Sequence, residues 1–216
     1  MNASRRNFHE ELKSLQNDML KMGSFVEEAI RRSVEALKNG DLELANKVCR
    51  DDDIIDDYEV KLEEKCTRLI ALQQPVAIDL RKIIVISKLA TDLERIGDHT
   101  CNIAEMVIKI GDENLIKPLI DIPKMTDLVI KRLRKSLEAF VDMDIKKAKQ
   151  VVEEDEKVDI FDQQIISELI NIMIDDPSNI EQATSLMFIS RFLERIGDHS
   201  TNISERTIYM KTGQRL

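Results

Sequence analysis

The stretch Leu93-Glu94-Arg95-Ile96-Gly97-Asp98-His99-Thr100-Cys101-Asn102-Ile103-Ala104-Glu105 occurs twice in this chain. Residues 193–205 repeat it at a constant offset of 100, and ten of the thirteen positions are identical. A repeat that keeps acids, a histidine and an amide in place indicates an internal duplication. We therefore expect two copies of one fold, each with a polar site that packing alone would not require.

Length and composition limit the possible folds. The chain has 216 residues, of which 43% are hydrophobic and only 4% aromatic, with six Gly, four Pro and no Trp. This composition is typical of a helical protein. It argues against a β-sandwich or barrel, which needs many turns and aromatic or β-branched strands.

The charge and the cysteines narrow the class of protein further. A net charge of −9 disfavours nucleic-acid binding, which depends on a basic face. The basic cluster Lys131, Arg132, Arg134 and Lys135 is best explained as one solvated helix face. Three cysteines lack metal or disulfide spacing, and neither a signal peptide nor an apolar run of about 18 residues occurs. These features predict a cytoplasmic protein without membrane spans.

Apolar residues recur at steps of three or four along most of the chain, which is the pattern of amphipathic helices. Six helices are predicted, at about residues 4–37, 42–72, 76–110, 124–140, 145–174 and 180–211. Gly40, Pro75 and Pro177 mark short turns, so consecutive helices should run antiparallel. The predicted fold is all-α, with two tandem antiparallel three-helix bundles at 1–112 and 118–216. A linker at 113–117 lies inside the Gly- and Pro-containing stretch 111–123.

Acidic residues form a stripe on the last predicted helix of each half. Its members are Glu94, Asp98 and Asn102 in the first half and Glu194, Asp198 and Asn202 in the second. A second acidic set lies on the preceding helix, and the two halves align there at an offset of 103. This set comprises Asp52, Asp56 and Glu59 in the first half and Asp155, Asp159 and Asp162 in the second. Adjacent antiparallel helices should bring the two sets of each half together, facing away from the main apolar seam.

These twelve residues are candidate metal ligands. Like charges three or four positions apart on a helix cost about 0.2–0.5 kcal/mol per pair. An ordinary solvated helix would place Lys or Arg at these steps, yet Asp52, Asp56, Asp159 and Glu94 have none. A bound cation would offset the repulsion, and without one the carboxylate pKa values should rise. Carboxylate and amide oxygens suit Mg²⁺, Ca²⁺ or Mn²⁺, and an added imidazole would suit Fe, Zn or Ni. The alternative is an acidic, solvated surface.

The histidine and the glycine of the repeat each suggest a role. His99 and His199 follow Asp98 and Asp198 directly, and we expect each imidazole to orient the neighbouring carboxylate rather than bind metal itself. The glycines at 97 and 197 lie in mid-helix, where glycine costs about 0.8–1 kcal/mol relative to alanine. Their repetition predicts close approach by another backbone or a bound group.

The motifs give little support for catalysis. The Glu-x-x-His spacing of di-iron carboxylate proteins is absent, and no nucleophile–base pair or Gly-rich phosphate loop occurs. We therefore predict a protein that is not an enzyme, with no catalytic residues and no organic cofactor site. Two alternatives stay open. One is a metal-dependent hydrolase or oxidase that activates water on clustered metals. The other is a metal-independent helical scaffold that docks basic partners on its acidic face.

The chain resembles the PhoU family over essentially its whole length. Three features carry the resemblance: the repeated Leu-Glu-Arg-Ile-Gly-Asp-His motif, the segment Leu72-Gln73-Gln74-Pro75-Val76-Ala77-Ile78-Asp79-Leu80-Arg81, and acid pairs four residues apart. The resemblance implies two three-helix bundles related by a pseudo-twofold axis, with multinuclear metal clusters on the bundle surface. The acid pairs that would bind them are Asp52/Asp56, Glu94/Asp98, Asp155/Asp159 and Glu194/Asp198.

The resemblance also implies a function. Members of the family are cytoplasmic regulators of phosphate uptake and homeostasis that work with the phosphate ABC transporter and its sensor histidine kinase. They repress the phosphate-starvation response, often as homodimers, and would meet the membrane only through these partner proteins. The metal is expected among Fe, Zn, Mn, Mg and Ni.

One segment is not duplicated. Asp79-Leu80-Arg81 in the first half corresponds to Asn179-Ile180-Glu181 in the second. Either this segment contacts a partner from one half only, or its charges cap and pair near a helix start.

Overall fold

The computed structural model describes residues 3–214, with side chains from residue 7 onward, and most of them are helical. The first half contains α1 (Ala3–Asn39), α2 (Leu42–Gln73) and α3 (Ala77–Ile110). The second half contains α4 (Asp121–Asp142), α5 (Ile145–Glu153), α6 (Glu156–Asp175), the short 3₁₀ helix η1 (Pro177–Asn179) and α7 (Ile180–Thr212). No strand occurs in the described range, so the predicted all-α class is confirmed.

Local capping explains where several helices begin. Gly40 has a positive φ of 63°, and directly after it Asp41 caps α2 by accepting a hydrogen bond from the backbone N–H of Leu44 (2.9 Å). Asp144 caps α5 in the same way, accepting from the amides of Lys146 and Lys147 (2.9 and 3.1 Å). A side-chain cap of this kind stabilises a helix by about 1 kcal/mol. The short turns between antiparallel helices are therefore encoded locally.

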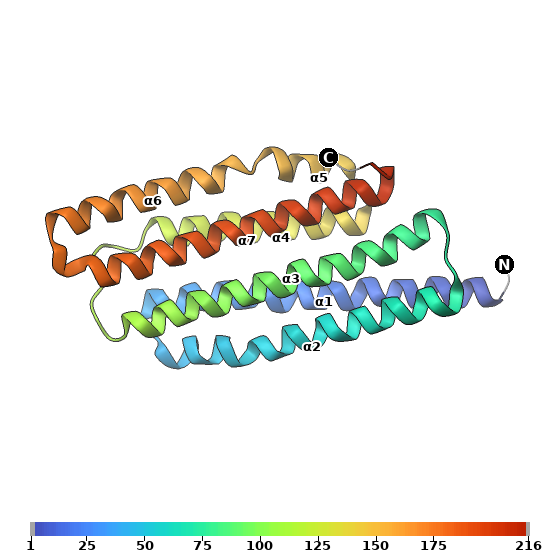
Figure 1. The fold of residues 1–216 in the computed structure, drawn as a ribbon, viewed down its shortest axis with the longest axis horizontal. Helices are drawn as coiled ribbons and strands as arrows, with labels where there is room; N and C mark the ends of the chain where they lie inside the picture. Colours follow the sequence, from blue (N-terminus) through green and yellow to red (C-terminus); the bar gives the residue numbers. More distant parts are fainter. Residues whose placement is uncertain (1–2, 215–216) are drawn as a thin grey trace.

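The two halves meet along α3 and α7, which lie side by side at the centre of the molecule and run in opposite directions (Figure 1). The helices α2 and α6 lie at the two outer edges of this view. Leu89 and Leu93 of α3, and Leu193 and Ile203 of α7, have no exposed surface. One cluster of buried apolar side chains runs through both halves. The two bundles therefore share a core that is built on the apolar faces of α3 and α7.

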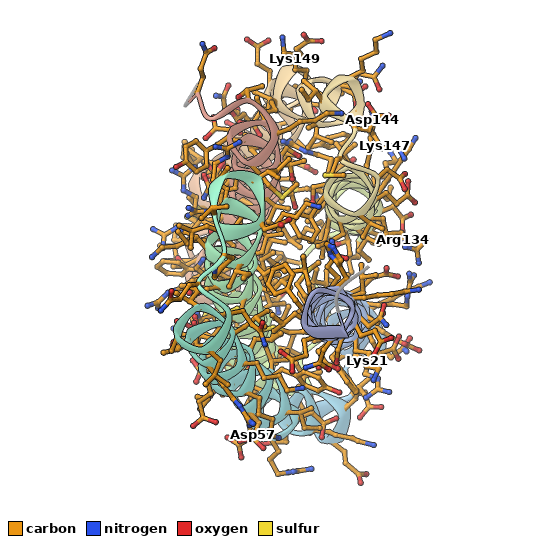
Figure 2. The ribbon with its side chains drawn as sticks, turned by 90° about the vertical axis from the view of Figure 1, so that its right-hand side faces the viewer. Lys21, Asp57, Arg134, Asp144, Lys147 and Lys149 are labelled. Carbon is orange, nitrogen blue, oxygen red and sulfur yellow. The ribbon has the colours of Figure 1, made fainter. Side chains whose placement is uncertain are left out.

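Charged side chains project outward around the periphery, while apolar ones fill the interior (Figure 2). On the face opposite to the central helices, Arg134 of α4 lies beside α1, and its Nε donates to Glu27 Oε2 (2.6 Å). Asp144 and Lys147 mark the turn between α4 and α5 in the same view. No helix within residues 3–214 is both long and apolar enough to cross a membrane.

Two of the predicted helices differ from the structure by more than two residues. The helix α4 begins at Asp121, three residues earlier than expected, with Pro123 in its first turn. Proline is tolerated there because the first turn leaves its N–H groups unbonded in any case. The predicted helix 145–174 is interrupted at residues 154–155. Arg132 of α4 donates to the carbonyl oxygens of Val151 and Asp155 at this break (3.4 and 3.2 Å). No Gly or Pro marks the position, so only the tertiary contact explains it.

Candidate metal centre

The first acidic site lies where α2 packs against α3. Asp52 and Asp56 come from α2, and Glu94 and Asp98 come from α3. Gly97 makes this approach possible, because a Cβ atom added there would lie 2.7 Å from Asp52 Oδ1 and 3.1 Å from a methyl carbon of Ile55. The predicted close approach at the first mid-helix glycine is confirmed, and the approaching group is a side chain of the neighbouring helix.

Asp52 is the electrostatic centre of this first site. Its Oδ1 is buried and has no hydrogen-bond partner in the described part of the chain. Burial, and after it the negative charges of Asp56, Asp98 and Glu94, together raise the pKa of Asp52 to about 7. Burial and the charge of Asp98 also raise the pKa values of Asp56 and Glu94. An unpartnered buried oxygen among mutually repelling carboxylates fits a bound cation.

Two other residues contact this site or lie close to it. Arg95 reaches Asp98 (3.1 Å) and Glu94 (3.5 Å), but its side chain is 58% exposed, so these ion pairs are weak. Glu59 adds to the rise in the pKa of Glu94, which places its charge near the same group. The surrounding charge therefore remains mainly negative.

The second acidic site gathers three carboxylates from α6 and α7. One oxygen from each of Asp159, Glu194 and Asp198 lies within 4.8 Å of the other two, an arrangement that could hold a metal ion. Burial and the charge of Asp198 raise the pKa of Glu194 to about 6, although Arg191 at 3.0 Å acts against this rise. Within residues 7–214 this is the one group of three acids, cysteines or histidines that converges so closely.

Asp155 is paired differently from its repeat counterpart Asp52. Arg132 donates to Asp155 Oδ1, and Thr201 donates to the same oxygen (2.9 Å). Only 1% of Arg132 is exposed, so the prediction of a solvated basic face is wrong at this position. At the offset of 103 that relates Asp52 to Asp155, the counterpart of Arg132 is Ala29. The second half therefore supplies its own buried cation where the first half has none.

Two further predicted ligands are engaged elsewhere. Asp162 is buried and accepts hydrogen bonds from Ser190 (2.7 Å) and Arg191 (3.2 Å), so both of its oxygens already have partners on α7. Asn202 lines a cleft between α3 and α7 instead of joining the carboxylates. Steps of four residues rotate by about 40° around a helix each time, because a helix turns 100° per residue. Two such steps lead from Glu194 to Asn202, so the Asn202 side chain is turned away from the side of α7 that faces the other carboxylates. Asn102, the repeat counterpart of Asn202, is half-buried on α3.

The two histidines of the repeat, His99 and His199, lie between the two halves. Within residues 7–214 neither one makes a hydrogen bond to its neighbouring carboxylate, so the orienting role stays a prediction. His199 Nδ1 is 3.2 Å from Asp92 Oδ1 across the α3–α7 contact. His99 stacks on Phe192 with ring centroids 5.8 Å apart, and it is 5.7 Å from His199. Burial, and after it the nearby charges of His199 and Arg195, together lower the pKa of His99 to about 4.

Asp92 is a polar residue of the core that the sequence reasoning missed. It is 4% exposed and accepts from Arg206 Nε (2.6 Å) as well as contacting His199. A comparison of the two halves could have found it, because neither member of this pair has a polar counterpart. The position equivalent to Asp92 is Phe192, and the position equivalent to Arg206 is Met106. The polar pairing therefore exists at one end of the α3–α7 contact only.

The unduplicated segment has a structural role at Arg81. Its Nε donates to the carbonyl oxygen of Met210 (3.0 Å), near the end of α7. A cation at the carbonyl end of a helix is stabilised by the helix dipole. This contact joins the start of α3 to the end of α7 and accounts for an arginine in one half only.

Duplicated three-helix bundles, each with carboxylates gathered between its middle and last helix, place this chain among helical-bundle proteins with paired acidic sites. A family model described as the PhoU domain matches residues 19–107 and 122–207. The chain belongs to the PhoU family.

Relatives match along nearly the whole length. A "Phosphate-specific transport system accessory protein PhoU homolog" of Clostridium acetobutylicum is 40% identical, covering 99% of this chain and 98% of the relative. The accessory protein PhoU of Escherichia coli is 35% identical, covering 96% and 86%. The crystal structure of PhoU from Pseudomonas aeruginosa superimposes with a TM-score of 0.91 at 36% identity, covering 96% of this chain and all of that one. The chain is thus an accessory protein and not an enzyme.

Proposed function

We propose that this chain is a cytoplasmic regulator of phosphate uptake and phosphate homeostasis. It acts as a metal-binding adaptor between a phosphate ABC transporter and its sensor histidine kinase, and it represses the phosphate-starvation response. Support comes from relatives that are named as accessory proteins of the phosphate-specific transport system and that match over nearly their full length. The observation that carries the metal part is the buried, unpartnered Asp52 Oδ1.

The two acidic sites would hold the cations. Asp52, Asp56, Glu94 and Asp98 form the first set, and Asp159, Glu194 and Asp198 form the second. A divalent or trivalent ion would neutralise the repulsion within each set and link the middle helix of a half to its last helix. Sites whose ligands are all oxygen atoms favour hard cations such as Mg²⁺, Mn²⁺ and Fe³⁺ over Zn²⁺ or Ni²⁺. Several carboxylates at each site leave room for more than one ion.

The positions of the two sites support the adaptor role. Each set spans two neighbouring helices, so a bound ion would stiffen the face that α2 and α3, or α6 and α7, present to a partner. Removing the ion would restore carboxylate repulsion and loosen that face. Metal occupancy would in this way affect contact with the transporter or the kinase. The relatives are named as accessory proteins, which disfavours the alternative of a metal-dependent hydrolase or oxidase.

A homodimer is part of the proposal. Three large apolar side chains are exposed on neighbouring positions of α6 and α7: Ile170, Ile174 and Phe188. Exposed apolar groups of this kind mark protein contact surfaces more often than isolated exposed residues do. Light scattering during size-exclusion chromatography measures the molar mass in solution. A monomer at all concentrations would contradict the homodimer.

The metal part is tested by elemental analysis of purified protein. The variant Glu94→Ala/Glu194→Ala should retain little bound metal, while Glu35→Ala, an exposed acid on α1, should retain the wild-type amount. Equal metal content in all three proteins would contradict metal binding at these sites.

The adaptor part needs a separate test. Affinity-tagged chain would be recovered from cells grown with and without phosphate, and the bound proteins identified by mass spectrometry. Transporter and kinase subunits should co-purify with the wild type and Glu35→Ala, and less with the metal-site variant. Recovery of neither partner under both conditions would contradict the adaptor role whatever the metal content.

A further inference from the structure

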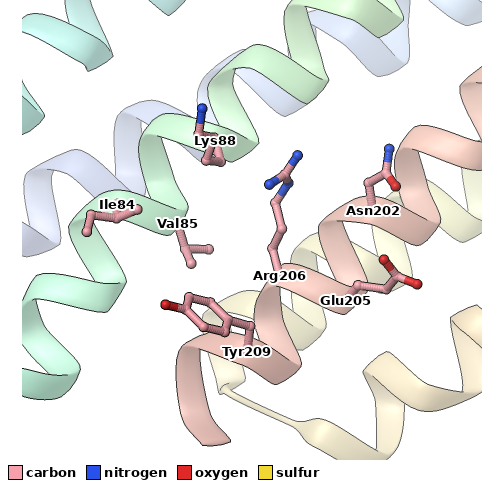
Figure 3. A pocket seen from close by; sticks show the side chains of 7 residues that line it. All are labelled: Ile84, Val85, Lys88, Asn202, Glu205, Arg206 and Tyr209. Carbon is pink, nitrogen blue, oxygen red and sulfur yellow. The ribbon is translucent and has the colours of Figure 1, made fainter. Parts of the chain in front are cut away.

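A cleft of about 330 Å³ opens between α3 and the last third of α7, on the contact between the two halves (Figure 3). Its polar lining comes from Lys88 on α3 and from Asn202, Arg206 and Tyr209 on α7. Ile84 and Val85 supply an apolar side. The volume lies at the lower end of the range of small-molecule sites. None of the carboxylates of the two acidic sites lines it.

The basic groups of the cleft face a common space. Arg206 extends from α7 into the gap between the helices, with Lys88 on one side of its guanidinium and Asn202 on the other (Figure 3). Val85 and the ring of Tyr209 lie below it. Glu205 is the acid on the cleft lining, and its carboxylate is directed to the side of α7 away from Lys88. The space next to the guanidinium is therefore bordered by two cations and an amide.

Arg206 is held in position by a buried acid. Its Nε donates to Asp92 Oδ2 (2.6 Å), and the Asp92 side chain is 6% exposed while that of Arg206 is 37% exposed. A guanidinium carries five N–H donors in a planar fork, so this bond leaves the terminal nitrogens to face the cleft. Asp92 in turn contacts His199. A buried anchor with an exposed fork is a geometry suited to an oxyanion, which arginine binds in a bidentate manner.

The charged residues at the cleft are not repeated at the equivalent end of the α3–α7 contact. Asn202 and Glu205 are matched by Asn102 and Glu105 in the other half, but the charged positions just outside the repeated stretch differ. At the offset of 100, Lys88 corresponds to Phe188, Asp92 to Phe192, and Arg206 to Met106. At the equivalent end, Phe188 and Phe192 stack on each other (6.3 Å) and His99 stacks on Phe192. Three linked polar changes at one cleft indicate a binding function more than a packing role.

We propose that this cleft binds a small phosphomonoester. Lys88, Arg206 and Asn202 take the phosphate group, and the Tyr209 ring with Ile84 and Val85 packs against an apolar or aromatic body. In a protein with a net charge of −9, an anion can bind only where cations locally dominate. The ligand would contact α3 and α7 together and so bridge the two halves. The inference goes beyond the adaptor proposal and does not require metal.

Phenyl phosphate is the probe, and isothermal titration calorimetry of the full chain in EDTA is the measurement. Inorganic phosphate and benzoate serve as partial probes that lack the apolar body and the phosphate group respectively. Phenyl phosphate should bind once per chain and more tightly than either. If benzoate binds as tightly as phenyl phosphate, the cleft does not select a phosphate group. If inorganic phosphate binds as tightly as phenyl phosphate, the apolar side of the cleft does not contribute to binding. Either result would overturn the proposal. No binding of any probe at millimolar concentration would overturn the site.

Matched variants locate the binding. Lys88→Ala should weaken phenyl phosphate about 10-fold or more, since it removes a charge-assisted hydrogen bond. Lys109→Ala removes the same charge from α3, about 30 Å away by helix rise, and should change the affinity less than about twofold. Equal effects of the two variants would overturn the proposal.

Arg206→Met, which introduces the residue of the other half, should also abolish binding. If Arg206→Met fails to fold, Lys88→Ala still tests the proposal, because no hydrogen bond or ion pair joins the Lys88 side chain to another residue within 7–214. Glu94→Ala/Glu194→Ala should bind phenyl phosphate like the wild type, so a failed metal proposal leaves this test intact.

Discussion

Arg132 reaches from α4 to the carboxylate of Asp155 and supplies, inside the second half, the positive charge that Asp52 lacks in the first. The two acids occupy equivalent places in the duplication, and Ala29 stands where the first half would need the arginine. The acidic sites are thus related by sequence but differ in charge. Because of this difference, removing the charge of the equivalent acid should change the free energy of unfolding in opposite directions in the two halves.

Substituting the two equivalent acids should change stability in opposite directions. In metal-free protein at pH 8, Asp52→Asn removes a repelled, half-buried charge and should stabilise the fold by about 1–2 kcal/mol, an estimate reduced for solvent screening. Asp155→Asn leaves the buried Arg132 without its anion and should destabilise the fold by roughly 2 kcal/mol or more. Urea unfolding in EDTA measures both. Changes of the same sign would show that Arg132 does not compensate Asp155.

The stability gain from Asp52→Asn should depend on pH. The pKa of Asp52 is raised by burial from 3.8 to about 7 in the folded state, so the folded chain holds this proton after the unfolded chain has released it. The free energy of unfolding of the metal-free wild type therefore falls, through this group, as pH rises from about 4 to 7, and stays level above 7. Asp52→Asn lacks this dependence. Its advantage should be near zero at pH 4 and full at pH 8, whereas an equal advantage at both values would contradict the raised pKa.

Added metal should stabilise the wild type through two separable sites. A cation at 100 times its Kd raises the free energy of unfolding by about 2.7 kcal/mol per site, because it binds the folded carboxylates and not the unfolded chain. Thermal unfolding with and without Mn²⁺ should show an increase in Tm that Glu94→Gln and Glu194→Gln each reduce. The double variant should lose it altogether. Glu35→Gln is the control, and an unchanged increase in the double variant would place the metal elsewhere.

Alanine at the two mid-helix glycines should have different effects on metal binding. The helix gains about 0.8–1 kcal/mol from either change. At Gly97 the new methyl group would lie 2.7 Å from Asp52 Oδ1, so the carboxylate has to rotate away. At Gly197 the nearest atom is a methyl carbon of Val158 at 3.3 Å, and no carboxylate has to move. Gly97→Ala should therefore lower Mn²⁺ affinity in calorimetry several-fold, and Gly197→Ala should leave it within about twofold. The reverse order would contradict the first site.

Asp92 and Arg206 should be energetically coupled. Asp92→Ala leaves the guanidinium of Arg206 without its anchor, and Arg206→Met leaves a buried carboxylate without a cation, so each should destabilise the fold by about 2–3 kcal/mol. The double variant should cost at least about 1 kcal/mol less than the sum, because neither unpaired charge remains. A double-mutant cycle of urea unfolding measures this coupling. Additive effects would mean that the pair contributes nothing across the α3–α7 contact.

Much of the fold could be predicted from the sequence because its signals are local. The three- and four-residue steps of apolar side chains, together with Gly40, Pro75 and Pro177, were sufficient to place the helices and turns within a few residues. The break before α6 was not predictable, since it depends on Arg132, which lies about 20 positions earlier in the chain. Arg132 was also predicted to lie on a solvated face, because four of the five residues at 131–135 are basic, which is typical of an exposed helix surface.

The sequence by itself determined the duplication, the helical class and the eight acids that pair at steps of four, since repetition and helical periodicity can be recognised along a single chain. Only the tertiary structure decided which of those acids remain free to bind a cation. Asp155 is neutralised by Arg132, whereas Asp52 Oδ1 has no hydrogen-bond partner in the described part of the chain. The structure also placed both histidines in the contact between the halves. The physical reason is that a carboxylate's partners come from whichever helix packs against it, and that packing joins residues far apart in the chain.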